Sequence, residues 1–146
     1  MRYETTRFDI VDVTPEQIIT FPQGLPGFGE LRKFFLVPVP ENKCFAWLQS
    51  ADRPEVAFLV TDPFLVCPQY KVHLPLAEME LLQVKRPEDV SLHVIVRIPA
   101  DGKAEDITAN LVAPVVINAA SCLGCQLVLE GSVHAIREPL FRSSHA

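Results

Sequence analysis

The 146-residue sequence contains no long apolar run. None of its hydrophobic stretches approaches the roughly 18 residues that a membrane-spanning helix requires. Residues 1–7 also lack the apolar centre of a secretion signal. We therefore expect a protein that stays in the cytoplasm and does not enter a membrane. In that compartment the four cysteines are expected to be free thiols and not disulfides.

Glycine is scarce as well, and the six glycines stand singly. Their spacing provides no glycine-rich phosphate loop. The sequence contains neither the nucleophile elbow of hydrolases nor the two-histidine helix of zinc proteases. Its carboxylates are spaced like those of an ordinary solvated surface and form no evident acid/base pair. We expect no enzymatic activity and no cofactor.

The sequence has no excess of positive charge. Thirteen Lys and Arg residues stand against 18 Asp and Glu residues, which gives a net charge of −5. Direct binding to nucleic acid or to an anionic membrane depends on a basic surface, so we expect neither. An acidic surface is compatible with attraction to a basic protein partner.

One cysteine pair, Cys122-x-x-Cys125, has a spacing that metal and redox sites use. A structural zinc site usually needs two such pairs, and Cys44 and Cys67 stand far apart. A thioredoxin-like motif would begin a helix in a βαβ unit, and that pattern is absent. None of the four histidines has ligand spacing: His73, His93, His134 and His145. We expect a structural role for Cys122 and Cys125. The alternative function is a small metal- or ligand-binding β-barrel that uses this pair.

What the sequence does contain is a series of about ten short apolar segments separated by turn residues, which is typical of a β-barrel or β-sandwich. The predicted strands are residues 3–13, a segment ending at residue 21, 33–39, 44–50, 56–61, 91–98, 107–112, 115–117, 126–129 and 133–136. Good helix formers in residues 76–84 predict one short helix. The sequence therefore predicts a mainly β fold. We expect a small antiparallel β-barrel-like single domain over residues 1–146, with residues 139–146 as a flexible tail.

Some segments allow finer predictions. Residues 44–50 and 56–61 are apolar on both faces, which favours a central and covered position for both strands. Trp47 is accordingly expected in the core. In residues 91–98 the alternation places Leu92, Val94, Val96 and Ile98 inward and His93 outward.

Other segments predict connections and the role of buried amides. Residues 62–72 are expected to be irregular, and Asp101-Gly102 is a hairpin signal. Asn110, Asn118 and Gln126 lie in apolar stretches, where their amides are expected to satisfy backbone groups at strand ends.

The stretch from residue 19 to residue 28 predicts a stiff bend. Leu25-Pro26-Gly27-Phe28 fits a type II turn, because Pro26 presets φ near −65° and Gly27 permits the positive φ that follows. Two interpretations of the bend remain open. In the first, which we call the plug interpretation, Leu25 and Phe28 fill one end of the protein's own core. In the other interpretation, part of this apolar knob faces outward and binds another protein.

Several separated segments resemble the FliW family of flagellar assembly factors, and they occur in the family's order over nearly the whole chain. The segments are Phe21-Pro22-x-Gly24-Leu25-Pro26-Gly27-Phe28, residues 45–50 with Asp52, Ala57-Phe58 leading to Asp62-Pro63, residues 110–118 and residues 126–129. The sequence departs from the family pattern at Gly29, where an acidic residue is expected, and at His134, where a tyrosine is expected. The Cys122/Cys125 pair is not part of the pattern.

The resemblance implies a non-enzymatic regulator with a small β-barrel-like fold. FliW-type proteins bind flagellin in the cytoplasm, and when flagellin is scarce they bind the translational regulator CsrA. Binding to CsrA relieves its repression of flagellin mRNA. The resemblance therefore implies flagellin and CsrA as partners, with no direct contact to nucleic acid, and we expect a monomer when the chain is free. For partner binding we predict the exposed portions of Leu25 and Phe28 together with the nearby acidic residues Glu30 and Asp52.

Overall fold

The computed structural model describes residues 2–6, 8–129 and 137–140. The strands in the first half of the chain are β1 (Arg2–Thr5), β2 (Asp9–Asp12), β3 (Ile19–Thr20), β4 (Lys33–Pro38), β5 (Phe45–Ser50) and β6 (Ala57–Thr61). The strands in the second half are β7 (Val90–Arg97), β8 (Thr108–Ala109), β9 (Val115–Asn118), β10 (Leu123–Gln126) and β11 (Glu138–Pro139). The helices are short: α1 (Pro63–Val66), α2 (Leu76–Leu81), and the 3₁₀ turns η1 (Pro15–Gln17), η2 (Pro87–Asp89) and η3 (Ala104–Asp106). The mainly β prediction is confirmed.

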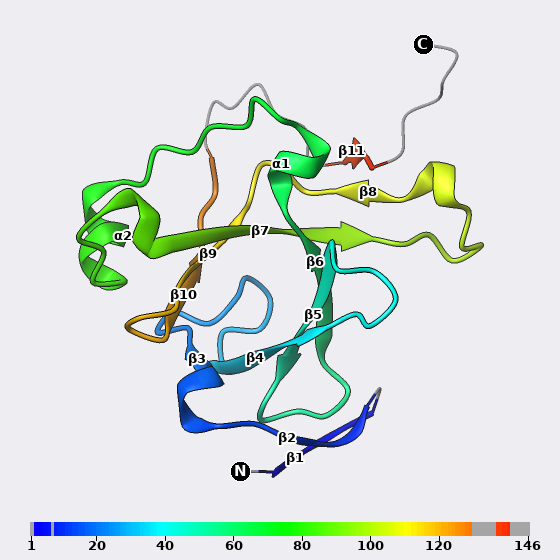
Figure 1. Ribbon diagram of the computed structural model, residues 1–146, viewed down its shortest axis with the longest axis horizontal. Helices are drawn as coiled ribbons and strands as arrows, with labels where there is room; N and C mark the ends of the chain where they lie inside the picture. The colour runs from blue at the N-terminus through cyan, green and yellow to red at the C-terminus, as the bar shows by residue number, and fades with distance from the viewer. Residues whose placement is uncertain (1, 7, 130–136, 141–146) are drawn as a thin grey trace.

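The strands close into a barrel-like ring. Their order is β7-β6-β5-β4-β3-β10-β9, and β9 pairs again with β7. Figure 1 shows β7 crossing the middle of the molecule, with β4 and β5 on the opposite side of the ring. Every strand pairing among the described residues is antiparallel except the short β3–β10 pairing, which is parallel. The ring protects strand edges that would otherwise expose unpaired backbone groups.

The interior of the ring is the main apolar core. Aromatic and aliphatic side chains from β3, β4, β5, β6 and β9 meet there: Ile19, Phe34, Leu48, Val60, Val115 and Ile117. The central position predicted for β5 and β6 is confirmed, since both lie in the interior of the strand order, but the first three residues of β6 are only half-buried.

The β1–β2 hairpin covers the outer face of β4 and β5. Tyr3 lies 5.4 Å from Phe35 between ring centroids, and Phe8 lies 6.4 Å from Trp47. Trp47 is therefore half-buried beneath the hairpin and not inside the ring. The single strand predicted over residues 3–13 is wrong, because the Thr5 hydroxyl accepts a hydrogen bond from the Phe8 backbone N–H and donates one to the Asp9 carbonyl, closing a tight turn.

The segment from α1 to α2 covers the outer face of β7 and β9. Leu82 packs there against Val116, together with Leu92 and Val90. Each face of β7 is consequently covered, and the predicted inward and outward directions of this strand need correction. His93 pairs with Val115, a residue of the ring interior, so His93 faces the ring. Leu92, Val94 and Val96 point to the other face, and Ile98 is exposed.

The three amides predicted to satisfy backbone groups do so. The Asn118 amide donates to the Leu82 carbonyl at 2.9 Å, and its oxygen accepts from the Ala120 N–H at 3.0 Å. The Gln126 amide donates to the Ala113 carbonyl, and the Asn110 oxygen accepts from the Val112 N–H. Asn118 thus ties the segment after α2 to the end of β9.

Three further segments differ from the prediction. Residues 62–72 begin with α1 instead of being wholly irregular. Gly102 forms the predicted turn with a φ of +70°, but the chain returns through η3, and β8 is only two residues long. The strand predicted over residues 126–129 lies earlier, at β10, because its antiparallel pairing with β9 begins at Leu123 opposite Asn118.

The flexible tail predicted over residues 139–146 begins too early, because Pro139 belongs to β11 opposite Thr108 and the Leu140 N–H donates to the Ile107 carbonyl at 2.9 Å. The rest of that tail, residues 141–146, and the strand predicted over residues 133–136 lie outside the described residues. Among the residues that are described, no helix is long and apolar enough to cross a membrane.

Candidate protein-binding surfaces

The bend between β3 and β4 has the turn that the sequence predicts. The Phe28 N–H donates to the Leu25 carbonyl at 2.7 Å, and Gly27 has a φ of +85°. A second turn precedes it, in which the Gly24 N–H donates to the Phe21 carbonyl at 2.8 Å. Two consecutive hydrogen-bonded turns with glycine at each positive φ make a stiff element.

Leu25 points into the protein and not toward a partner. Its side chain is 2% exposed and packs in the ring interior with Phe21 and Phe34. The plug interpretation therefore holds for this residue. The exposed portion that we predicted for Leu25 is almost nil, so a contribution to partner binding would act through the shape of the bend.

Phe28, Glu30 and Asp52 lie at the same end of the ring. Phe28 is half-buried, with its ring 5.4 Å from that of Phe58 on β6. Glu30 precedes β4 and Asp52 follows β5, and both are exposed. The ends of these strands meet where the Ala51 N–H donates to the Lys33 carbonyl at 2.9 Å. The fold thus brings these three predicted residues to one end, and their role in binding stays a prediction.

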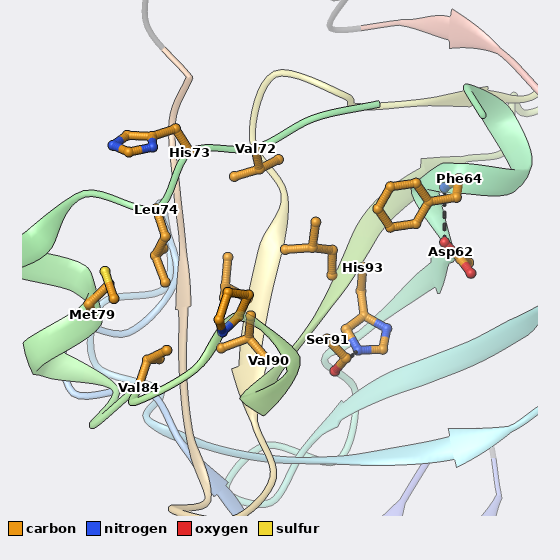
Figure 2. Close-up of a pocket in the computed structure, with 13 residues that line it drawn as sticks. Asp62, Phe64, Val72, His73, Leu74, Met79, Val84, Val90, Ser91 and His93 are labelled. Atoms are coloured by element: carbon orange, nitrogen blue, oxygen red, sulfur yellow. Dashed lines mark hydrogen bonds between the residues drawn. The ribbon is translucent and has the colours of Figure 1, made fainter. Parts of the chain in front are cut away.

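A second candidate surface is a cavity that the sequence did not predict. It has a volume of about 620 Å³ and lies between α1, α2 and β7. We refer to it as the α1–α2 cavity. Its walls are largely aliphatic: Val72, Leu74, Met79, Val84, Val90, Leu92 and Val116. Figure 2 shows Met79 and Leu74 on one side of the cavity and Phe64 and Asp62 on the other, with Ser91 and His93 of β7 between them.

The end of the cavity next to α1 is polar. The Ser91 hydroxyl lies 2.9 Å from His93 Nε2. Asp62 is exposed and caps α1, because its Oδ1 accepts a hydrogen bond from the Phe64 N–H at 2.9 Å. Ser91 and His93 also line a smaller hollow at the mouth of the ring, next to Cys122. One strand therefore connects the apolar cavity with the end of the barrel.

The environment of His93 makes the stability of the fold depend on pH. Burial lowers the pKa of His93 below its ordinary value of 6.5, and the nearby Asp62 charge opposes this shift only in part. The unfolded chain therefore binds a proton at a pH where the folded chain does not. We expect the free energy of unfolding to fall as the pH drops through 6.5 toward the lower pKa of the folded state.

Denaturant titrations of the wild type and of His93→Gln at pH 7.5 and at pH 5.5 measure this effect. The loss of stability between the two pH values should be smaller in His93→Gln, which has no proton to take up. Equal losses in both proteins would contradict the assignment to His93.

The two cysteines of the Cys122-x-x-Cys125 motif face different surroundings. Cys122 is half-buried at the turn before β10, where its thiol donates to the Glu16 carbonyl at 3.3 Å. Cys125 is buried in the apolar cluster of Leu82 and Val116, and burial raises the pKa of its thiol to about 11. Within the described residues, no three His, Cys, Asp or Glu side chains gather as a metal site. The separation of these two thiols gives the metal-binding alternative no support.

The residues of the α1–α2 cavity escaped prediction for an identifiable reason. Asp62 followed by Pro63 is a helix-start signal, with a capping carboxylate and a proline at the first helical position. That signal marks α1, although the four-residue helix is too short to show an apolar period. His93 appeared outward because a one-strand alternation cannot tell which of two covered faces is the ring interior.

Comparison with known proteins places the whole architecture in one family. Residues 2–140 match the family model described as FliW protein. A flagellar assembly factor FliW of Moorella thermoacetica is 46% identical over 144 residues, which are 99% of this chain and 90% of that protein. A flagellar assembly factor FliW of Bdellovibrio bacteriovorus is 43% identical over 97% of this chain and 79% of that protein.

The fold agrees with this assignment. A crystal structure of the flagellar assembly factor FliW superposes with a TM-score of 0.90 at 33% identity, and the alignment covers 99% of both chains. The family model, the similar relatives and the barrel-like ring all lead to the same conclusion. This chain belongs to the FliW family of flagellar assembly factors.

Proposed function

We propose that this chain is a cytoplasmic regulator that acts by occupying the surfaces of two proteins, flagellin and CsrA. Bound to CsrA, it would relieve repression of flagellin mRNA. Rising free flagellin would take the chain away and restore the repression. Such partner switching needs two mutually exclusive complexes of comparable affinity, and it needs no catalysis.

The observation that carries this proposal is the closed and well-packed ring of strands in a FliW family member. A rigid scaffold can bind another protein with little loss of conformational entropy. Both candidate surfaces are rigid in this sense, since the bend is fixed by two turns and the α1–α2 cavity is bordered by β7. The net charge of −5 favours encounter with a basic RNA-binding protein and predicts that association weakens with salt.

Isothermal titration calorimetry with purified CsrA and purified flagellin from the same genome tests the proposal. We expect each protein to bind with a Kd in the micromolar range or below, because weaker complexes would not form at cellular protein concentrations. Flagellin added to the CsrA complex should release CsrA in gel filtration. A chain that binds neither protein, or a stable complex of all three, would contradict partner switching.

A further inference from the structure

The β1–β2 hairpin forms a sheet of its own. Among the described residues its two strands pair only with each other, while the other nine strands form a second sheet. The hydrogen bonds that shape the hairpin are internal, because β1 and β2 share a ladder and the Thr5 hydroxyl closes the turn between them. Figure 1 shows the hairpin at the margin of the molecule, next to β4. No strand ladder therefore has to break when the hairpin leaves the ring.

The contact between the hairpin and the ring is largely apolar. Tyr3 and Val11 pack against the cluster around Phe35, and Phe8 lies against Trp47. Apolar contacts of this kind are non-directional, so they form again whenever the two surfaces meet. The hairpin is thus attached as a cover on the outer face of β4 and β5.

The face under the turn of the hairpin contains a buried amide that is only partly satisfied. Gln49 of β5 is fully buried, and its Nε2 donates to the carbonyls of Ser50, Pro54 and Val56 at 3.0–3.2 Å. Its Oε1 is buried as well, and no described residue donates a hydrogen bond to it. A hollow of about 190 Å³ lies between Gln49 and Thr6 of the hairpin turn. Since a buried acceptor without a donor costs free energy, the closed position of the hairpin is disfavoured at this point.

One hydrogen bond ties the hairpin turn to the loop after β5, and its loss leaves no buried group unpaired. The Thr6 N–H donates to the Pro54 carbonyl at 3.0 Å. The same carbonyl also accepts the Gln49 Nε2, so it keeps a donor when Thr6 moves away. Thr6 is exposed, and its N–H then passes to water. Opening therefore breaks this bond at little cost.

We propose that the β1–β2 hairpin opens and closes as a unit over the outer face of β4 and β5 while the ring stays folded. Opening uncovers Phe35, Trp47 and the Oε1 atom of Gln49. The hairpin thereby controls access to an apolar face that carries a free hydrogen-bond acceptor. This device goes beyond the proposed function, and its test requires neither CsrA nor flagellin.

Fluorescence quenching by acrylamide tests the opening, because Trp47 is the only tryptophan in the chain. Tyr3→Ser removes the aromatic ring that packs on Phe35, and we expect the quenching constant of Trp47 to rise at least about twofold. Ile10→Ser is the matched control, since it removes a side chain of the same hairpin that is 59% exposed. It should be quenched like the wild type. Far-UV circular dichroism should show a folded ring in both variants.

Hydrogen exchange of the wild type, followed by NMR, tests whether the hairpin opens as a unit. A detached two-stranded hairpin is marginally stable, so its amides exchange in the open state. The ladder amides of β1 and β2 should share one opening constant, at least about tenfold larger than that of β4 and β5. Tyr3→Ser should raise the opening constant of the hairpin and leave that of β5 unchanged.

Three results would overturn the proposal. Equal opening constants in the hairpin and the ring would mean that the hairpin opens only when the barrel unfolds. A gradual decline of exchange from Arg2 inward would mean fraying of the chain end and not the opening of a unit. Quenching of Trp47 in Tyr3→Ser that equals the wild-type value would mean that the hairpin does not control access to the outer face of β5.

Discussion

Leu25→Asp is expected to unfold the protein at temperatures where the wild type is stable. The Leu25 side chain is 2% exposed and packs in the ring interior, so the substitution removes a buried side chain and places a carboxylate among apolar groups. Truncation of a buried leucine alone costs about 2–5 kcal/mol, and an unpaired buried charge adds to this. We expect a loss of about 4 kcal/mol or more in the free energy of unfolding. In a domain of this size, such a loss lowers the melting temperature by about 10 °C or more.

Gly29→Asp is the matched control for this prediction. It places the same carboxylate four residues later, at an exposed position where an added Cβ meets no atom within 4 Å. Its melting temperature should stay within about 2 °C of the wild type, as for most surface substitutions. Circular dichroism melts of the two variants measure the difference. If Leu25→Asp melted like the wild type and lost only partner binding, Leu25 would be a surface residue and the plug interpretation would be wrong.

The elements of the barrel could be predicted wherever the residue pattern itself carries the information. The existence of the strands β5, β6 and β7 and the turn chemistry of the bend depend on neighbouring residues alone, and these predictions are confirmed, whereas the faces predicted for β7 are not. The amide of Asn118 could also be assigned, because a buried amide must find backbone partners wherever it lies. These features follow from local geometry and from the cost of leaving polar groups unpaired.

What could not be predicted depends on contacts between distant parts of the chain. The β1–β2 hairpin is fixed by its packing on Phe35 and Trp47, which are more than 25 residues away in the sequence. The ring closes through β7 and β9, and only this pairing decides that His93 faces inward. The α1–α2 cavity likewise exists only because the segment after β6 crosses the outer face of β7. A cavity between such elements has no signature in any single segment.

The bend also depends on one close approach between backbone segments. Gly24 has a φ of +66°, and a Cβ at this position would lie 2.7 Å from both the Cα and the carbonyl oxygen of Gly29. Backbone atoms cannot move away as a flexible side chain would, so Gly24→Ala has to open the two turns of the bend. We expect Gly24→Ala to lower the free energy of unfolding by about 3 kcal/mol. This figure is the sum of the cost of a left-handed alanine and the cost of relieving the overlap with Gly29. Denaturant titration measures this loss.

Gly27→Ala separates the conformational part from the overlap. Gly27 has a φ of +85°, but an added Cβ there meets no atom within 4 Å. Gly27→Ala should therefore lower the free energy of unfolding only by the cost of a left-handed alanine, about 1 kcal/mol. The difference between the two variants, about 2 kcal/mol, then measures how tightly the bend folds back on itself. Equal losses in Gly24→Ala and Gly27→Ala would mean that the bend relaxes freely. In that case it would not be the stiff element that holds Leu25 in the ring.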